Sequence, residues 1–333
     1  MAKPTLTDYV QLIFTLFDMF AQQQSPQPKR GHPFTFTEKA MIALFTLFQF
    51  RRICHFKAQW RWLTGHPEML PLLGLARVPH RTTLSRRYKQ LYATLQAFMC
   101  FISQYAADLD AAFRQDHLVE DKSLFKALGP VWHQSDRKAG HIPAKLRHLD
   151  TDATWSKSAY QGWVYGYGLH ITCNEAAFPI LVQVETAAYP EADVLDNKAD
   201  HLLHTLAPET VAADNKYTKA MRIRRWAGQG VALLTPAFKW VKGRYAQAYH
   251  RFIQQPHNAE RLRRRRTSVE PLFDLVAKVL GTTGQHKQLP VQRQANVRTC
   301  LTLATLSVQI AMMINSIWGL PLRNISTMAV AFS

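Results

Sequence analysis

The hydrophobic period of the chain changes near residue 115, and this change limits the possible folds more than any other feature. Before it, apolar residues recur at helical spacing, as in TEKAMIALFTLFQF, where Thr37 fits an N-cap. After it, WVYGYGLHITC and FPILVQVET are rich in β-branched and aromatic residues and flank the turn-like NEAA. We therefore expect an all-helical N-terminal part, followed by an α/β part in which these two segments pair as a hairpin.

The rest of the α/β part alternates between short strands and helices. HLVEDKS, TVAADNKY and GVALLTP have the composition of short strands, whereas EADVLDNKADHLLHTL and KAMRIRRWAG have helical patterns. A basic stretch at 239–262 has neither pattern and is expected to be irregular. This order predicts a mixed sheet flanked by helices. We expect a helical domain at residues 1–112 and an α/β domain at 113–333, with a small basic insertion near 239–262.

One segment, CLTLATLSVQIAMMINSIWGL at 300–320, has no charged residue and is long enough to span a bilayer. It also contains polar residues such as Thr302, Gln309 and Asn315. These side chains favour a buried core helix over a membrane span, so we expect no membrane partner.

The charge balance points to an anionic partner. Lys and Arg number 41 and Asp and Glu 23, which gives a net charge of +18. Such a surplus is typical of proteins that bind nucleic acid or an anionic membrane surface. The four cysteines are far apart and form no C-x-x-C pair, which argues against a structural zinc site and favours a reducing cytoplasm.

Two basic segments are candidate DNA contacts. VPHRTTLSRRYKQLYATL predicts a helix that begins after His80, and its basic or polar face consists of Arg81, Thr82, Arg86, Arg87 and Lys89. A short helix, a turn and this basic helix match a helix-turn-helix, although an ordinary bundle with a solvated basic face fits equally well. The second segment is RRRRTSVEPLFDLVAKVLG, where four arginines precede a helix expected to carry Glu270 in its first turn.

Three acidic residues lie at or near the ends of expected elements. Asp121 ends the first strand, Asp214 follows the fourth, and Glu270 lies on the late helix, with separations of 214 − 121 = 93 and 270 − 214 = 56 residues. Open α/β sheets place their sites at strand ends. Taken singly, each acid could instead pair with a neighbour, namely Lys122, Lys216 or Arg266.

Three converging carboxylates would repel one another unless hard cations neutralised them. Mg²⁺ prefers oxygen ligands, and two such ions can clamp both oxygens of a phosphodiester displacement. The acids therefore suit phosphoryl transfer on nucleic acid, with arginines holding the flanking phosphates.

These stretches resemble the DDE transposases of bacterial insertion sequences, of the broad group that includes insertion-sequence families 4 and 5. DTDATWSKSAYQGWVYGYGLH looks like the approach to their second catalytic strand, VAADNKYTKAMRIR like the segment of their second aspartate, and RTSVEPLFDLVAK like their glutamate helix. The chain differs from the pattern at three positions: Arg263 replaces a frequent tyrosine, Ala277 (beside Lys278) a lysine, and Gly168 another lysine.

The resemblance implies an RNase H-like catalytic domain with a mixed five-stranded sheet flanked by helices, preceded by an all-helical DNA-binding domain. It implies that Asp121, Asp214 and Glu270 are catalytic residues that hold two Mg²⁺ ions, for which Mn²⁺ would substitute. Water would then attack a phosphodiester at each transposon end, and the freed 3′-hydroxyl would attack target DNA. The expected partners are terminal inverted repeats, target DNA and, on DNA, a second copy of the chain. The expected location is the bacterial cytoplasm, in association with the nucleoid.

Several single residues have two interpretations. Glu120 rivals Asp121, but neighbouring strand residues point to opposite faces and the resemblance favours Asp121. Arg263, Arg266 and Lys278 could contact the DNA backbone or remain solvated, and Trp240 could stack on an unpaired base or pack in the core. Two other functions fit the sequence: a metal-dependent nuclease without strand transfer, and an inactive DNA-binding regulator.

Overall fold

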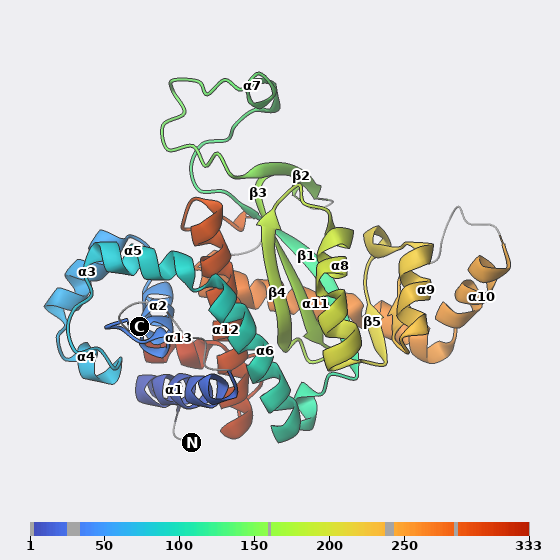
Figure 1. Ribbon diagram of the computed structural model, residues 1–333, viewed down its shortest axis with the longest axis horizontal. Coiled ribbons are helices and arrows are strands. Elements are labelled where there is room, and N and C mark those ends of the chain that lie inside the picture. Colours follow the sequence, from blue (N-terminus) through green and yellow to red (C-terminus); the bar gives the residue numbers. More distant parts are fainter. Residues whose placement is uncertain (1–2, 25–33, 159–160, 237–242, 283–285, 333) are drawn as a thin grey trace.

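The computed structural model describes residues 3–24, 34–158, 161–236, 243–282 and 286–332 (Figure 1). Its N-terminal part is all helical. The helices are α1 (Leu6–Gln23), α2 (Glu38–Phe50), α3 (Phe56–Gly65), α4 (Met69–Leu72), α5 (Arg81–Gln90) and α6 (Tyr92–Leu109), and the single turn η1 (Ala111–Phe113) leads into the sheet.

The remaining chain forms the α/β part, as the change of period predicts. Its strands are β1 (His117–Lys126), β2 (Thr154–Ser158), β3 (Gly162–Asn174), β4 (Pro179–Thr186), β5 (Thr210–Ala212) and β6 (Ala232–Leu234). Its helices are α7 (Gln134–Lys138), α8 (Glu191–His201), η2 (Leu202–Leu206), η3 (Asn215–Tyr217), α9 (Ala220–Gly228), α10 (Arg244–Ile253), α11 (Pro256–Val279), α12 (Gln294–Ile317) and α13 (Ser326–Phe332).

The sheet is mixed, with the strand order β2-β3-β1-β5-β6 along its main path and β4 also paired with β3. Strand β3 is antiparallel to β1, whereas β1, β5 and β6 are parallel. This order is consistent with an RNase H-like fold. The expected hairpin is confirmed as β3 and β4. The sheet has six strands and not the expected five, because β2 pairs with the first residues of β3 on the same side as β4.

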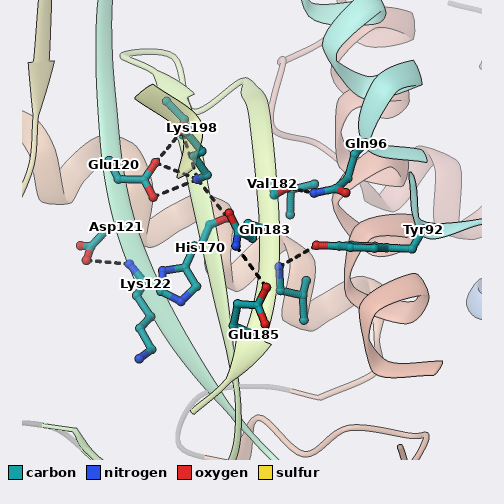
Figure 2. Close-up of polar contacts among 12 residues, drawn as sticks. Tyr92, Gln96, Glu120, Asp121, Lys122, His170, Val182, Gln183, Glu185 and Lys198 are labelled. Carbon is teal, nitrogen blue, oxygen red and sulfur yellow. Dashed lines mark hydrogen bonds and ion pairs between the residues drawn. The ribbon is translucent and has the colours of Figure 1, made fainter. Parts of the chain in front are cut away.

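The free edge of β4 is covered by side chains from two helices. The backbone N–H of Val184 donates to the Tyr92 hydroxyl at 3.1 Å, and Gln96 Nε2 donates to the Val182 carbonyl at 2.7 Å (Figure 2). From α12, Arg298 Nε donates to the Val184 carbonyl at 3.1 Å. Exposed edge strands pair readily with other chains. These bonds both protect the edge and attach α6 and α12 to the sheet.

Helix α12 is the buried core helix that its polar residues predict. It is long and apolar enough to span a membrane, but 89% of its most apolar window is buried inside the protein. Several of its polar side chains have partners within the fold: Gln309 Nε2 donates to the carbonyls of Met99 and Pro179, and Thr305 donates to Leu301. Buried polar groups of this kind are stable only when hydrogen-bonded.

Two aspartates of the DTD stretch cap the N-terminus of α12. The buried Asp150 accepts the backbone N–H of Arg293 at 2.9 Å and the Tyr167 hydroxyl at 3.0 Å. Asp152 accepts the N–H of Gln294 at 3.0 Å. Carboxylates satisfy the free N–H groups at a helix start and oppose the helix dipole. Asp150 and Asp152, in the segment that precedes β3, therefore stabilise the start of α12.

The basic stretch at 239–262 is more ordered than expected. Residues 237–242, with Trp240, lie outside the described residues, but the rest forms α10 and the first turns of α11. Because α11 begins at Pro256, Glu270 lies well inside the helix and not in its first turn. The predictions of an irregular stretch and of a later helix start failed because arginine is a good helix former, so a run of arginines does not interrupt a helix.

A buried ion pair fixes α8 on the sheet. Glu120 is fully buried and accepts two bonds of 2.9 Å from Lys198 Nζ of α8, while Thr172 donates to the same carboxylate at 2.5 Å (Figure 2). Burial lowers the pKa of Lys198, and the Glu120 carboxylate opposes that shift. Both charges are compensated only while the pair is intact.

Replacing Lys198 by Met leaves the buried Glu120 without its cation. We expect the free energy of unfolding to fall by about 3–5 kcal/mol, measured by urea denaturation. The double variant Glu120→Leu/Lys198→Met should recover most of this loss, because no unpaired charge remains. A single variant as stable as the wild type would show that the pair does not fix α8.

His170 lies beside this pair and is buried as a neutral base. It pairs across the sheet with Lys122 on β1 and Gln183 on β4, and neither ring nitrogen has a hydrogen-bond partner among the described residues. Burial, together with the nearby charges of Lys198 and Lys122, lowers the pKa of His170 to about 2. Below pH 6.5 the unfolded chain therefore takes up a proton at this residue that the folded chain does not.

This difference makes the folded state sensitive to acid. Protonation of His170 in the unfolded chain should lower the free energy of unfolding by about 1.4 kcal/mol for each pH unit below 6.5, until the pKa of His170 in the folded protein is reached. In His170→Gln, the loss of stability between pH 7 and pH 5 should be smaller than in the wild type by about 2 kcal/mol, in urea denaturation at both values. Equal losses in the two proteins would mean that His170 is protonated in the folded state.

Candidate functional site

The parallel pairing of β1 with β5 brings the first two acids together. Val119 on β1 pairs with Ala212 on β5. Asp121 and Asp214 each lie two residues further on, so they are level with one another on adjacent stretches of backbone. Asp214 continues the extended backbone of β5 (φ −80°, ψ −177°) before η3 begins. Because residues two apart share a face, both carboxylates point to the face that α11 covers. The predicted proximity of Asp121 and Asp214 is therefore supported by the strand register.

Glu120 and Asp121 leave β1 on opposite sides, as expected (Figure 2). Glu120 belongs to the structural pair with α8, so it is not a rival site residue. Asp121 Oδ2 accepts Arg265 Nη1 of α11 at 2.6 Å, and Oδ1 accepts its neighbour's backbone N–H, that of Lys122, at 2.8 Å.

The environment of Asp121 disfavours its negative charge. Burial raises the pKa of Asp121 to about 6, while the Arg265 guanidinium and the Lys122 N–H oppose the shift. The nearby carboxylates of Asp214 and Glu191 contribute to the raised pKa. Two other acids thus act on Asp121, and this combination of burial and like charges is typical of functional sites.

Glu191 is the acid that the sequence analysis missed. It is the first residue of α8 and is nearly buried, and its Oε1 lies 2.7 Å from Lys216 Nζ and 3.9 Å from Lys122 Nζ. Lys122 Nζ also donates to the carbonyls of Ala187 and Tyr189, which holds the turn before α8. Its position after Pro190 marks a helix start, but nothing in the sequence separates it from any other acid at such a start.

Glu270 is not part of this group. It is exposed on α11, and within the described residues its carboxylate has no hydrogen bond or ion pair. It follows Arg265 by five residues, which is roughly 140° around a helix of 3.6 residues per turn, so it points away from Asp121. Its charge acts on Lys287, where Glu270 and Asp274 both oppose the lowering of the lysine pKa by burial.

The alternative, in which each acid forms an ion pair with the neighbouring Lys122, Lys216 or Arg266, is not seen among the described residues either. Asp214 accepts the backbone N–H of Lys216 at 2.8 Å, whereas the Lys216 side chain bonds Glu191. Across the residues that the structure describes, no three acidic, histidine or cysteine side chains are placed to hold a metal ion. The two aspartates supply oxygen ligands suited to one Mg²⁺, but the predicted set of three is not assembled.

The four consecutive arginines of α11, residues 263–266, point in different directions. Arg265 is nearly buried against Asp121, whereas Arg263 and Arg264 are exposed and share Glu260 at 2.7 Å and 2.5 Å. Arg266 is exposed, as is Lys278 further along α11. Arg263 is therefore already paired, and Arg266 and Lys278 have the exposure that a phosphate contact needs. Periodicity could have identified Arg265, since it lies four residues before the buried Val269.

Gly168, which stands where the transposase pattern often has lysine, is covered by Lys122. A Cβ at Gly168 would lie 2.6 Å from Lys122 Cε and 3.1 Å from His170 Nε2. The Lys122 side chain from the neighbouring strand thus fills the space of the missing one. This difference from the pattern keeps a lysine at the same place in the sheet.

Helix α5 is confirmed, with the His80 side chain accepting the N–H of Thr82 as its N-cap. Four of the five predicted contacts lie on its exposed face, namely Arg81, Thr82, Arg86 and Lys89. Arg87 does not. It is 3% exposed, donates to the Phe36 carbonyl at 3.4 Å and stacks on the Phe34 ring at 3.9 Å from its centroid. Arg87 was a wrong prediction because it falls on the same buried stripe as Leu84 and Tyr88.

These two neighbouring arginines give a matched test of the α5 surface. Arg86→Ala should weaken DNA binding, with a smaller salt dependence and an unchanged melting temperature, because it removes an exposed phosphate contact. Arg87→Ala should lower the melting temperature, because it removes buried stacking and leaves the Phe36 carbonyl unpaired. Salt-dependent fluorescence anisotropy and thermal unfolding measure the two effects, and exchanged phenotypes would contradict the assignment.

Comparisons with known proteins do not identify a family. A search with models of protein families finds no match, and neither does a search of curated proteins. Among solved structures, a chain of the pre-cleavage Mos1 transpososome aligns over 93% of this chain and 98% of its own, with 9% identity and a TM-score of 0.19. A score this low does not establish a shared fold, so the functional argument depends on the site itself.

Proposed function

We propose that this protein is a metal-dependent DNA-processing enzyme of the DDE transposase type, with Asp121 and Asp214 at its catalytic centre. The observation that carries the proposal is the register of the parallel strands β1 and β5, which puts Asp121 level with Asp214, two residues beyond the end of β5. Two carboxylates on one face of a sheet, beside an arginine-rich helix in a chain of net charge +18, suit a phosphodiester substrate.

The two carboxylates fit a hard divalent cation. They supply oxygen ligands, and burial together with mutual repulsion makes their negative charge costly without a nearby cation. The Arg265 guanidinium now provides that positive charge to Asp121. When bound between Asp121 and Asp214, Mg²⁺ would polarise a phosphodiester and lower the pKa of a water molecule.

The other residues of the site would position the strand and balance charge. Arg266 and Lys278, exposed along α11, would contact backbone phosphates on either side of the scissile bond. Arg265, released from Asp121 when the cation binds, would be free to pair with a phosphate oxygen. Lys216 would either stay in its ion pair with the Glu191 carboxylate or leave it, in which case Glu191 would be free to act in the site.

The third acid has two candidates. Glu270 is favoured by the resemblance, and it would have to turn toward the aspartates. The residue after it, Pro271, has no N–H to bond the Thr267 carbonyl, so bending α11 at this point costs less than elsewhere. Glu191 lies close enough for its charge to raise the pKa of Asp121, but its carboxylate would have to leave its ion pair with Lys216 to enter the site.

Strand transfer, recognition of inverted repeats and pairing of two copies on DNA are included in the proposal because of the resemblance. A nuclease without strand transfer would have the same acids and would release cleaved ends without joined products. An inactive regulator would bind DNA and never cut it. Gel analysis of a plasmid that carries the gene with its flanking DNA separates the three outcomes.

The central variant is Asp214→Asn. It should reduce Mg²⁺-dependent cleavage by about 100-fold or more, because it removes a charged ligand at the reacting centre. DNA affinity should stay unchanged. The control is Asp274→Asn, an exposed acid on α11 whose ion pair within the described part of the chain is a 3.9 Å contact with Lys287. Normal cleavage by Asp214→Asn would refute the site.

Paired glutamate variants identify the third acid. If Glu270 completes the site, Glu270→Gln should lose cleavage to the same degree as Asp214→Asn, and Glu191→Gln should retain it. The opposite result would assign the role to Glu191. The affinity for Mn²⁺, measured by calorimetry, gives a second readout, since loss of a ligand weakens metal binding whether or not DNA is cut.

A further inference from the structure

A pocket of about 370 Å³ lies at the far end of β1, beside the paired strands β2 and β3. Three aromatic rings and three polar side chains contribute to its wall: Trp155, Trp163, Tyr165, Lys126, His286 and Gln288. None of the described residues that line it is acidic. Its composition therefore differs from the carboxylate site further back along the strand.

Two of the aromatic residues are held rigidly in place. The rings of Trp155 and Tyr165 are 5.4 Å apart, as cross-strand partners of β2 and β3. Trp155 Nε1 donates to the Trp132 carbonyl at 2.7 Å, and the Tyr165 hydroxyl donates to the Asp150 carbonyl at 2.6 Å. Their polar atoms are satisfied, so they form a preorganised apolar wall.

Trp163 is different because it is 60% exposed. A tryptophan is rarely left so open to solvent without a partner, since it has a large apolar surface. Its cross-strand partner is the exposed Lys157, and Lys126 and His286 share the pocket. An exposed aromatic face surrounded by basic side chains is the arrangement that stacks a nucleobase and attracts its phosphate.

The pocket is also at a useful distance from the acids. Tyr165 in its wall lies on the same face of the sheet as Asp121, because Asp121 pairs with Ile171 and Tyr165 precedes Ile171 by six residues on β3, which is roughly 20 Å at 3.4 Å per residue. A DNA strand advances about 3.4 Å per base pair, so a strand held at Asp121 would pass the pocket about six nucleotides away.

We propose that this pocket binds the base of an unpaired nucleotide in the DNA strand that occupies the Asp121 and Asp214 site, with Trp163 as the stacking ring. The inference depends on the proposed DNA-processing function and adds a substrate preference to it. A strand with an unpaired segment near the cut is bound more tightly than a continuous duplex, and the Gln288 amide can hydrogen-bond the edge of the base.

The test compares two fluorescent DNA probes with the full-length protein in EDTA, so that no cleavage occurs. One probe is a blunt duplex, and the other is the same duplex with a single-stranded oligothymidine extension. The wild type should prefer the extended probe. Trp163→Ala should weaken its binding by about fivefold or more, as expected for one lost base stack, and leave the blunt duplex unaffected.

Two further variants make the result specific. Trp163→Phe keeps an aromatic face and should retain most of the preference, whereas Met221→Ala, which changes a 70% exposed apolar residue on α9, should have no effect. Thermal unfolding checks that each variant folds. Equal loss on both probes, or no preference in the wild type, would overturn the pocket assignment and leave the acids untouched.

The experiment also separates the two proposals. A preference that depends on Trp163, in a protein that never cuts DNA with Mg²⁺, would support the pocket and refute the catalytic proposal. Failure of the wild type to bind either probe would refute both.

Discussion

The parallel pairing of β1 with β5 is the constraint on which the rest of the site depends. It lines up Asp121 with Asp214, although the 92 residues of intervening chain include the strands β2, β3 and β4 and the helices α7, α8 and η2. Parallel strands need such a crossover, so the chain between them must fold before the acids can meet. Helices α8 and α11 then cover the two faces, and each supplies one cation to β1: Lys198 to Glu120, and Arg265 to Asp121.

Consecutive acids on β1 therefore have opposite roles. Glu120 is enclosed: Lys198 compensates its charge, Thr172 donates a hydrogen bond to it, and it can change partners only if α8 moves. Asp121 is partly accessible, its pKa is raised, and one of its two partners is a long arginine side chain on another helix. Ion pairs of the first kind stabilise a structure, and ion pairs of the second kind can be exchanged for a metal or a phosphate.

Local patterns in the sequence were enough for the elements and for part of the site. Helical spacing predicted α5 and α12, and strand composition predicted β3 and β4 as a hairpin. What failed depended on contacts between distant segments. Arg87 was assigned to solvent although the Phe34 and Phe36 segment covers it, and Glu191 was overlooked because its link to Lys216 exists only after folding.

The arginine-rich helix shows the same limit. Its sequence indicated an amphipathic helix and a glutamate, but not that α11 starts at Pro256 or that Arg265 is the arginine that points inward. Strand β2 was missed for a different reason, because its few residues pair only with the first half of β3 and lack a strong apolar pattern of their own.

The most direct test of the central claim is to locate the metal by its chemistry. Fe²⁺ that replaces Mg²⁺ in the site, with ascorbate and peroxide, generates hydroxyl radicals that cut the polypeptide next to the bound ion. If Asp121 and Asp214 hold the cation, mass spectrometry of the fragments should find cuts near both residues, suppressed by excess Mg²⁺ and lost in Asp214→Asn. Cuts elsewhere in the chain, or cuts near the two aspartates that persist in that variant, would contradict the account.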